Sequence, residues 1–394
     1  MNSGKYVFAQ VMEFLPRYEF DKLVRKYNGD HRSRHLTSYN HLLHLVFGQL
    51  TSCGSLRDIC LCLNAHRRSL YHLGFGQSVN ESSLSRAGER RDSRIFEELG
   101  QVLVRIVRPM YENEIVPDVD LPEKVILALD STTISCSIRL MSWAYGKYGR
   151  GAVKMHTLLD LRGSIPVFIH MTHGKWHDSN MLDVIDFVPC ATYVMDKAYV
   201  DLKALYRMHK ENAFFITRAK SNMRYSVIGR RDVDRATGLR DDVSVRLSGS
   251  RSGKLYPEEM RLVRYYDGGS GETLEFITNN LELKAIEVAN LYRNRWQIET
   301  FFKWVKGNLT VKTLWGHSEN AVRIHLWTAI CTYLLVARIK AELRCSYSVS
   351  EVATLLSVSA LEKTSLRELL DDKYNDSSDS NHDVNEPNLF NESI

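Results

Sequence analysis

The stretch AIEVANLYRNRWQIETFFKWVKGNL, residues 285–309, has the pattern of a single long helix. It contains no proline, and its one glycine, Gly307, lies near the end. At about 100° per residue, one polar stripe roughly 60° wide contains Tyr292, Arg295, Glu299 and Lys306. The adjoining stripe is apolar and contains Leu291, Ile298, Phe302, Val305 and Leu309. The helix is therefore expected to bury one flank and to present, beside it, a carboxylate between two cations and a phenol.

These charges alone do not identify a functional helix, because an exposed face carries chance i,i+3 and i,i+4 pairs as well. Two other stretches favour a functional interpretation of this helix over an ordinary exposed face. Residues 124–130, KVILALD, form a short apolar run that predicts a buried strand ending at Asp130. Residues 192–199, TYVMDKAY, repeat this arrangement with Asp196. One aspartate at a strand end is usually a cap or turn residue, but two of them together with Glu299 indicate a shared acidic site.

The order Asp130, Asp196, Glu299 resembles the DDE triad of insertion-sequence transposases. The helix also matches Y-x2-R-x3-E-x6-K, the signature of the IS-four group of these enzymes, at all four positions. Similar phrases surround the acids, namely LALDSTTI, GAVKMHTLLDLRGSIP, THGKWHDSN and SENAVRIHLW, and the resemblance covers roughly residues 4–343. One departure is DKAY at residues 196–199, where many relatives have DxGY; the acid and the aromatic residue remain.

The resemblance implies an α/β protein with an RNase H-like catalytic core, an all-β insertion in that core and a helical N-terminal DNA-binding region. The core segments fit this order: a hairpin is predicted over residues 154–161 and 165–172, followed by helices at about 179–187 and 202–210 and a strand at 213–217. The expected divisions are a helical region 1–115, core 116–218, a β-rich insertion 219–278, core and following helix 279–345, and a C-terminal segment 346–394 with an acidic, disordered tail.

The N-terminal region has apolar residues at helical spacing in residues 39–50 and 56–63, and Ser55 is the expected cap of the second helix. Ser82 or Ser83 is the expected cap of a further helix. The arginines of that helix either pair with nearby Glu and Asp or contact DNA; they are Arg86, Arg90, Arg91 and Arg94.

The predicted insertion lacks helical periodicity and contains short alternating segments separated by glycines. Its basic residues outnumber the acidic ones, which suits a surface that follows phosphates, although a solvated sheet face is the alternative. Arg261 and Arg264 are the residues predicted to contact DNA. Relatives in the group stack a flipped base on an aromatic residue of the insertion. No tryptophan lies in this insertion, so one of Tyr225, Tyr256, Tyr265, Tyr266 or Phe276 would have to take that role.

Composition sets broad limits on the class of protein. The 394 residues are 44% hydrophobic, enough for a large core, and a net charge of +5 is compatible with nucleic acid without requiring it. Seven cysteines without framework spacing predict free thiols in a reducing cytoplasm. A zinc site at Cys60, Cys62, His66 and His72 is the less favoured alternative to buried thiols. No apolar run is long enough to predict a membrane span, and the start is unlike a signal peptide.

The resemblance implies a DNA transposase that cuts at terminal inverted repeats and joins the 3′-hydroxyl ends to target DNA, acting as a homodimer in the DNA complex. The three acids suit two Mg²⁺ ions, for which Mn²⁺ would substitute, since magnesium prefers oxygen ligands. Arg295 is expected to grip a phosphate bidentately, with Lys306 and Tyr292 at neighbouring phosphates. The alternatives are a nuclease without strand transfer and a silent DNA-binding descendant. The intact triad counts against the silent descendant, and the intact helix signature counts against the simple nuclease.

Overall fold

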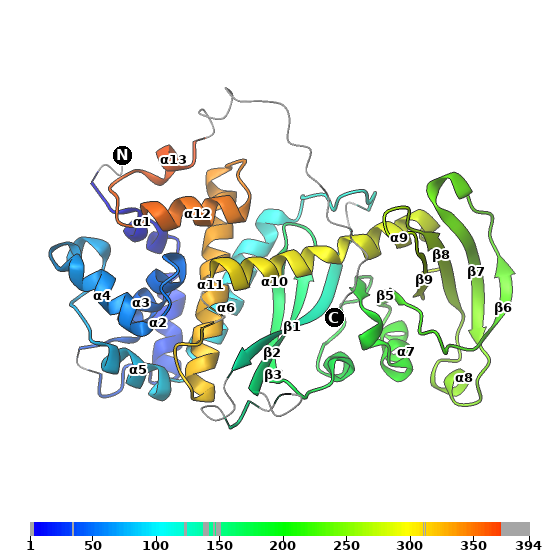
Figure 1. The fold of residues 1–394 in the computed structure, drawn as a ribbon, viewed down its shortest axis with the longest axis horizontal. Helices are drawn as coiled ribbons and strands as arrows, with labels where there is room; N and C mark the ends of the chain where they lie inside the picture. Colours follow the sequence, from blue (N-terminus) through cyan, green and yellow to red (C-terminus); the bar gives the residue numbers. More distant parts are fainter. Residues whose placement is uncertain are drawn as a thin grey trace.

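A single sheet extends through the sheet-containing part of the molecule, and a bundle of helices adjoins one end of it (Figure 1). The computed structural model describes residues 4–33, 35–121, 124–136, 142–144, 146, 151–309, 311 and 313–371. The strands in this part of the chain are β1 (Ile126–Cys136), β2 (Gly151–Asp160), β3 (Ile165–His173), β4 (Thr192–Met195), β5 (Phe214–Arg218), β6 (Tyr225–Arg230), β7 (Leu239–Leu247), β8 (Met260–Tyr266) and β9 (Thr273–Thr278). Their order in the sheet is β3-β2-β1-β4-β5-β9-β8-β7-β6.

The helices of the same part of the chain are α1 (Val7–Glu13), α2 (Arg17–Lys26), α3 (Ser38–Leu50), α4 (Leu56–Ala65), α5 (Glu81–Arg90), α6 (Arg94–Val107), α7 (Leu202–Lys210), α8 (Ser252–Leu255), α9 (Ala285–Asn294), α10 (Trp296–Asn308), α11 (Glu319–Leu343), α12 (Val349–Ser359) and α13 (Leu366–Leu369). Short 3₁₀ turns join several of them, including η1 (Arg67–Ser69), η2 (Tyr71–Leu73), η5 (Asp178–Asp183) and η6 (Lys197–Tyr199). The predicted acidic tail lies outside the described residues from residue 372 onward.

The centre of the sheet changes from antiparallel to parallel pairing. Strand β1 pairs antiparallel with β2 and parallel with β4, and β4 pairs parallel with β5. Because β1 and β4 run in the same direction, the residues that follow their paired segment in each chain lie at the same end of that segment. In this register Leu129 lies opposite Met195, so the next residue on each strand, Asp130 and Asp196, lies beside the other. Neighbouring strands are about 4.8 Å apart, which brings the two acids close together.

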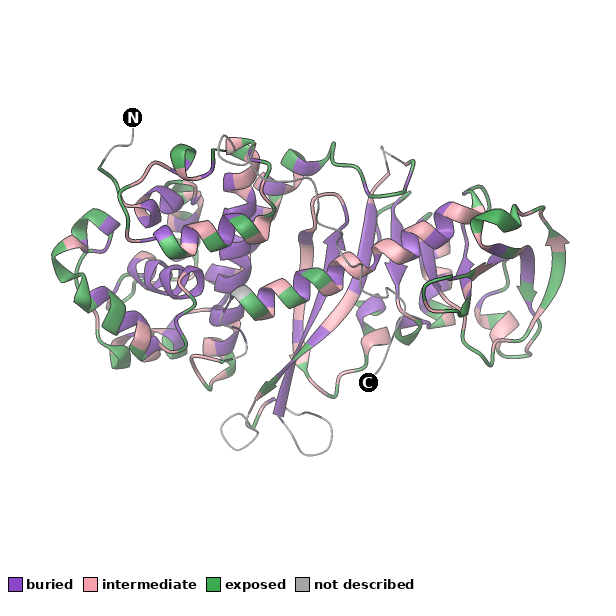
Figure 2. Cartoon of the chain, turned by 45° about the horizontal axis from the view of Figure 1, so that its top comes forward, coloured by how far each residue is buried: buried purple, intermediate pink, exposed green. Residues whose placement is uncertain are grey.

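The two faces of the sheet carry different hydrophobic cores, and β1 contributes to both. Ile126 and Ala128 belong to the larger core, which continues into the helical region, whereas Leu127 and Leu129 belong to a smaller core with α7. Successive side chains of a strand point to opposite faces. Asp130 therefore faces the larger core and α10, and Ser131 faces the other side. Figure 1 shows α10 lying across β1, and Figure 2 shows that the central strands are buried.

Helix α11 forms the axis of the helical region and packs against α3, α5, α6 and α12. Contrary to the prediction that no run is long enough to span a bilayer, this helix is long and apolar enough to do so by length and composition alone. However, 89% of its apolar window is buried inside the protein, as in the core helix of a soluble domain. Polar residues such as His325 and Thr332 interrupt the apolar run in the sequence, but both are buried in the folded helix.

Several predicted helices differ from the observed ones. The predicted helix over residues 285–309 is divided into α9 and α10 at Arg295, where i,i+3 hydrogen bonds replace the α-helical pattern: Arg295 N–H donates to the Tyr292 carbonyl (3.1 Å) and Ile298 N–H to the Arg295 carbonyl (3.0 Å). The helix predicted after Ser82 or Ser83 is likewise two helices, α5 and α6. Its cap is Asn80, whose side chain accepts from Ser83 N–H.

Other elements agree with the sequence pattern. Helix α7 has the predicted bounds, and Ser55 caps α4 by accepting from Asp58 N–H.

Two further segments differ from the prediction. The predicted helix at 179–187 is instead the 3₁₀ turn η5. Residues 219–278 contain β6 to β9 and the short helix α8, and these strands extend the central sheet rather than forming a separate one.

The cysteines partly follow the expectation of buried, free thiols. All seven are free, and Cys60 is buried, whereas Cys62 is exposed because it faces outward on α4. Among the described residues no cluster that could hold a metal ion includes these thiols, so the zinc alternative finds no support.

Candidate active site

The first two acids lie where the parallel pairing of β1 and β4 ends. The prediction that the strand ends at Asp130 is wrong: β1 continues to Cys136, because β2 goes on pairing with it. Asp130 is within β1, and its side chain is 22% exposed. Its Oδ1 accepts a hydrogen bond of 2.7 Å from the backbone N–H of Ser131. Asp196 directly follows β4 and precedes the turn η6. Both carboxylates are therefore fixed by strand segments that are buried on both faces, and only Asp196 lies at a strand end as the sequence pattern predicted.

The third acid reaches this edge from the helix. Glu299 lies in the first turn of α10, which packs on β1. Arg295, at the junction of α9 and α10, connects it to the strand: Nη1 lies 3.1 Å from Asp130 Oδ2, and Nη2 lies 2.8 Å from Glu299 Oε1. The junction thus places one guanidinium between two of the three predicted acids. Arg295 can contact Glu299 because residues four apart on a helix lie on the same face.

The electrostatics of the site show an excess of negative charge. Burial raises the pKa of Asp130 to about 6; the charges of Glu299 and Asp196 add to this shift, and Arg295 and the Ser131 N–H oppose it. Burial by itself would lower the pKa of Arg295, but Tyr292, Asp130, Glu299 and Asp196 outweigh it and raise the pKa above its ordinary value. Three carboxylates thus influence one another around a single guanidinium.

The donor set suits a hard divalent cation. Among the residues that the structure describes, no three His, Cys, Asp or Glu side chains converge tightly enough to hold a metal as they stand. The guanidinium of Arg295 instead occupies the position between Asp130 and Glu299, where it is a stand-in for a cation. Three carboxylates are oxygen ligands of the type that Mg²⁺ prefers, so the residues fit such an ion once Arg295 moves away.

The remaining signature residues, Tyr292 and Lys306, are less open to solvent than the sequence suggested. The Tyr292 side chain is buried, with its ring 4.7 Å from that of Phe276 on β9 and 5.5 Å from the Arg295 guanidinium carbon. Lys306 is half-buried near the end of α10, about two turns, or roughly 10 Å, from Glu299. Of the four signature positions, Arg295 and Glu299 are thus the two that reach the strand-end acids.

The two arginines predicted to contact DNA in the insertion do not form a free basic surface. Arg261 is buried and forms an ion pair of 2.7 Å with Asp242, and it also donates to the Leu283 carbonyl. Arg264 is paired with both Glu275 (2.7 Å) and Asp241 (3.1 Å). Arg261 is buried inside the sheet and its charge is paired, so the structure does not favour the predicted contact with DNA. Arg264 presents no surplus charge to a phosphate.

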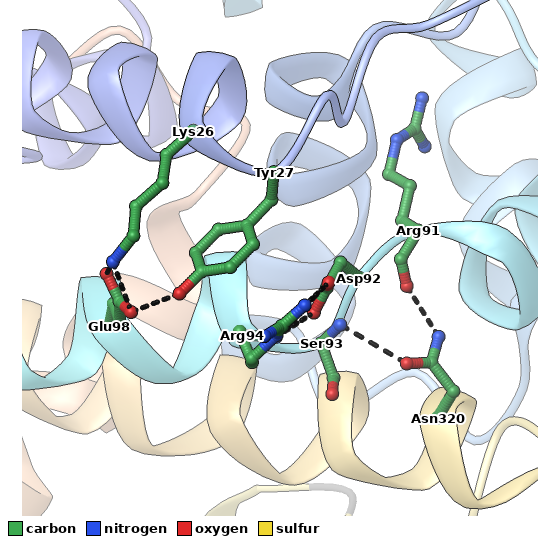
Figure 3. Close-up of polar contacts among 8 residues, drawn as sticks. All are labelled: Lys26, Tyr27, Arg91, Asp92, Ser93, Arg94, Glu98 and Asn320. Atoms are coloured by element: carbon green, nitrogen blue, oxygen red, sulfur yellow. Dashed lines mark hydrogen bonds and ion pairs between the residues drawn. The ribbon is translucent and has the colours of Figure 1, made fainter.

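The arginine cluster after α5 also has a structural role. The guanidinium of Arg91 is buried and donates to Ser38 Oγ (3.1 Å) and to the Leu36 carbonyl. Figure 3 shows its surroundings: Arg94 pairs with Asp92 at 2.6 Å, and Asn320 of α11 accepts from Ser93 N–H and donates to the Arg91 carbonyl. These contacts attach the junction of α5 and α6 to α11, so partner pairing is the correct interpretation of Arg91 and Arg94.

Sequence reasoning gave no role to a second polar cluster beside the acids. It consists of Ser131, Lys154, His156 and Asp178, on the face of the sheet opposite Arg295. Both Lys154 and Asp178 lie in phrases that carried the family resemblance, GAVKMHTLLDL and THGKWHDSN. The available signal was a lysine in the middle of an otherwise apolar strand, because such a lysine requires a buried partner.

Comparisons with known proteins relate this chain to a family of transposases. Residues 121–335 match the family model described as Transposase DDE domain, and residues 3–76 match a domain of unknown function, DUF4372. The chain is 34% identical over 220 residues to y4zB of Sinorhizobium fredii, which is named as a transposase; the match covers 55% of this chain and 60% of that protein. It is 29% identical over 219 residues to a protein of Geobacillus stearothermophilus named as a transposase for insertion sequence element IS5377, covering 54% and 56%.

A third relative, from a Synechocystis species, is named as a transposase for insertion sequence element IS4SA and is 28% identical over 271 residues, covering 66% of this chain and 72% of that protein. The chain thus spans little more than half the length of the first two relatives. Among solved structures, the piggyBac transposase synaptic complex with hairpin DNA has a TM-score of 0.47 and 10% identity, covering 92% of this chain and 81% of that one.

Proposed function

The chain belongs to the transposase DDE domain family, and from this premise we propose that it is a DNA transposase of a bacterial insertion sequence. It cuts DNA at terminal inverted repeats and joins the freed 3′-hydroxyl ends to target DNA. The observation that carries the proposal is the meeting of Asp130 and Asp196 at one sheet edge, with Glu299 joined to Asp130 through Arg295. The four signature positions support the IS-four group as its subfamily.

The proposal includes an RNase H-like core with an inserted β segment. Its support is the order of strands: the β1 to β3 meander is followed by β4, α7 and β5, with β4 and β5 parallel to β1. Residues 219–278, between the second and third acids, form the insertion, and α9 and α10 return the chain to the core. The proposed divisions are those expected from the sequence.

The proposed chemistry assigns different tasks to the acids and the cations. Asp130, Asp196 and Glu299 hold two divalent ions, Mg²⁺ or Mn²⁺, which when bound stabilise the charge on the attacking and leaving oxygens of an in-line displacement at phosphorus. Arg295 leaves the carboxylates and grips a phosphate through its planar fork. Lys306 contacts a neighbouring phosphate farther along α10, and Tyr292 supports the position of Arg295 from the buried side.

The N-terminal region is proposed to contact the DNA ends, through a surface other than the one first expected. With Arg91 buried and Arg94 paired, exposed basic residues remain at the corner formed by α4 and the turns η1 and η2: Arg57, Arg67 and Arg68. In the described part of the chain none of these three forms an ion pair. Residues 59–80, which include Arg67 and Arg68, contain no acid, and Asp58, beside Arg57, accepts a hydrogen bond from Ser55. We also propose that two copies of the chain act together on the paired DNA ends, in the cytoplasm.

That surface has a direct test. Replacement of the three arginines together by Ala should lower the slope of log affinity against log salt by about 2–3, because each neutralised phosphate contributes about 0.9. An Arg86→Ala/Arg90→Ala variant tests separately the two exposed arginines of α5, which the sequence also offered as DNA contacts. An unchanged slope for the triple variant would remove the corner from the DNA interface.

The function itself is tested with DNA that carries the terminal repeats flanking the gene. Wild-type protein with Mg²⁺ should nick this DNA and join the 3′ ends to a target plasmid, whereas Asp130→Asn, Asp196→Asn and Glu299→Gln should bind it in gel shifts without cutting. Asp160→Asn is the matched control, since Asp160 is a buried acid of β2 paired with Arg108 and Arg162 rather than with the site. Cutting without joining would indicate a nuclease, and DNA binding without cutting by the wild type would indicate a silent descendant.

A further inference from the structure

Ser131 connects the acid site to the opposite face of the sheet. Its backbone N–H donates to Asp130 Oδ1 at 2.7 Å on the α10 side. Its hydroxyl, on the other side, donates to Asp178 Oδ1 at the same distance of 2.7 Å. One residue is therefore hydrogen-bonded to both carboxylates, and a displacement of its backbone would move the donor that holds Asp130.

Asp178 is in turn fixed by a buried lysine. Lys154 Nζ lies 3.1 Å from both oxygens of Asp178 and 3.3 Å from the Trp176 carbonyl. An ammonium has three donors, and each has an acceptor here. Lys154 lies in the middle of β2, opposite Thr133 of β1 and Thr172 of β3, so the contact joins three strands to the loop that precedes η5. Such a buried lysine destabilises a fold unless it is paired.

The neighbouring histidine does not supply the positive charge. His156 lies opposite Ser131, with Nδ1 3.6 Å from Asp178 Oδ1. Burial lowers the pKa of His156 to about 4, although Asp178 opposes this shift, so the ring is neutral near pH 7. Its Nε2 pairs with Thr172 Oγ1 at 3.0 Å. The cation that balances Asp178 is therefore Lys154.

From these contacts we propose that Asp178 and Lys154 are positioning residues, which set the Asp130 carboxylate for metal binding from the far face of the sheet through Ser131. The inference rests on the proposed function, because it assumes that Asp130 is a metal ligand. Neither residue touches the reacting atoms. Residues that orient a ligand from behind it commonly affect metal affinity by about 10-fold to 100-fold.

The test is a calorimetric titration of the full chain with Mn²⁺. Ser131→Ala removes the hydroxyl link but leaves the Lys154–Asp178 pair intact, and it should weaken Mn²⁺ binding about tenfold. Ser131→Thr keeps a hydroxyl and should bind nearly as tightly as the wild type. Because Asp178→Asn alone would leave a buried lysine unpaired, the double variant Asp178→Asn/Lys154→Met is used, and it should also bind Mn²⁺ at least tenfold more weakly. Asp160→Asn, on the same strand but outside the cluster, should bind normally.

A structural role alone would give a different pattern. A positioning role predicts that DNA cutting by Ser131→Ala recovers toward the wild-type rate at saturating Mn²⁺, whereas a merely unstable variant would not recover. Wild-type Mn²⁺ affinity in both Ser131→Ala and the double variant would overturn the inference. If Asp130→Asn itself binds Mn²⁺ like the wild type, the proposed metal site fails, and that result is distinct from a failure limited to Ser131 and Asp178.

Discussion

Two arginine–carboxylate arrangements in this protein have the same side-chain chemistry and differ in their surroundings. Arg261 and Asp242 in the inserted segment are both about 3% exposed, and they form a pair of 2.7 Å with nearly all of the charge inside the sheet. Arg295 is 10% exposed, but its partners Asp130 and Glu299 are 22% and 36% exposed, and Asp196 adds a third negative charge. The first arrangement is closed and balanced, whereas the second is open and acidic.

This difference in burial and charge balance distinguishes a structural ion pair from the proposed functional site. A closed pair satisfies both partners and leaves no charge to bind a ligand, so its loss affects folding. An open group of three acids around one guanidinium retains a deficit of positive charge, which a divalent cation and a phosphate-bound arginine would redistribute. Such a deficit is tolerated because functional sites commonly sacrifice some stability.

The largest expected effect is on catalysis at the open site. Asp130→Asn should reduce DNA cutting by at least about a thousandfold, since a metal contributes several kcal/mol to charge stabilisation.

The same variant should unfold no more easily than the wild type at pH 7. The pKa of Asp130 is about 6 rather than 3.8, so the folded state holds this proton more tightly than the unfolded chain. The contribution of Asp130 to the free energy of unfolding therefore falls as the pH rises from 3.8 to 6. At neutral pH the ionised Asp130 carboxylate destabilises the folded state.

Parallel urea denaturation and cleavage assays check this pair of expectations. Asp196→Asn and Glu299→Gln should lose cleavage to a similar degree and keep DNA affinity. A variant of any of the three acids that cuts at a normal rate would exclude that residue from the site.

The next effect concerns the closed pair. Arg261→Ala leaves the Asp242 carboxylate buried without its main partner and should lower the free energy of unfolding by about 3–5 kcal/mol. The double variant Arg261→Met/Asp242→Leu should recover most of this loss. Measured on the soluble fraction, the slope of log DNA affinity against log salt should not change in the double variant. A reduced slope would restore Arg261 to the DNA interface and break the comparison.

A buried titratable group with no opposite charge provides a third case. His44 on α3 is buried, and burial lowers its pKa to about 4, although a hydrogen bond with the Asn40 carbonyl opposes this shift. Since the unfolded chain binds this proton near pH 6.5, stability should fall as the pH is lowered from 6.5 toward 4. The expected loss between pH 7 and pH 5 is about 2 kcal/mol from His44 alone. Denaturation of His44→Gln at both values should show a smaller pH dependence, with His66→Gln, an exposed histidine, as the control; equal pH dependence in all three proteins would contradict the expectation.

The smallest effect tests the guanidinium as a stand-in cation. Arg295→Gln removes a positive charge that contacts two carboxylates and should tighten Mn²⁺ binding by about tenfold while lowering cleavage. Arg295→Lys keeps the charge but loses the planar fork, so it should impair cleavage more than charge alone would predict. Weaker Mn²⁺ binding in Arg295→Gln would show that this arginine supports the acids rather than competing for them.

The predictable part of the site depended on local spacing. Glu299 follows Arg295 by four residues on a helix, and Asp130 and Asp196 end apolar runs, so these local patterns suffice to propose a shared acidic site. The same local rules gave α7 and the cap of α4. They failed where a helix pattern continued through a break, because the hydrogen-bond change at Arg295 and the burial of Arg91 depend on packing against other segments.

The sequence by itself therefore led to the proposal of the three acids, because the short motif around each acid is a property of residues adjacent in the chain. Only the tertiary structure determined which arginines are buried in closed ion pairs and which lie at the acidic site. Arg261 and Arg295 differ in the distant residues that face them: Asp242 across a strand pair in one case, Asp130 on β1 in the other. The link from Lys154 through Asp178 to Ser131 was equally invisible, because it joins segments that meet only when β1, β2 and the loop before η5 pack together.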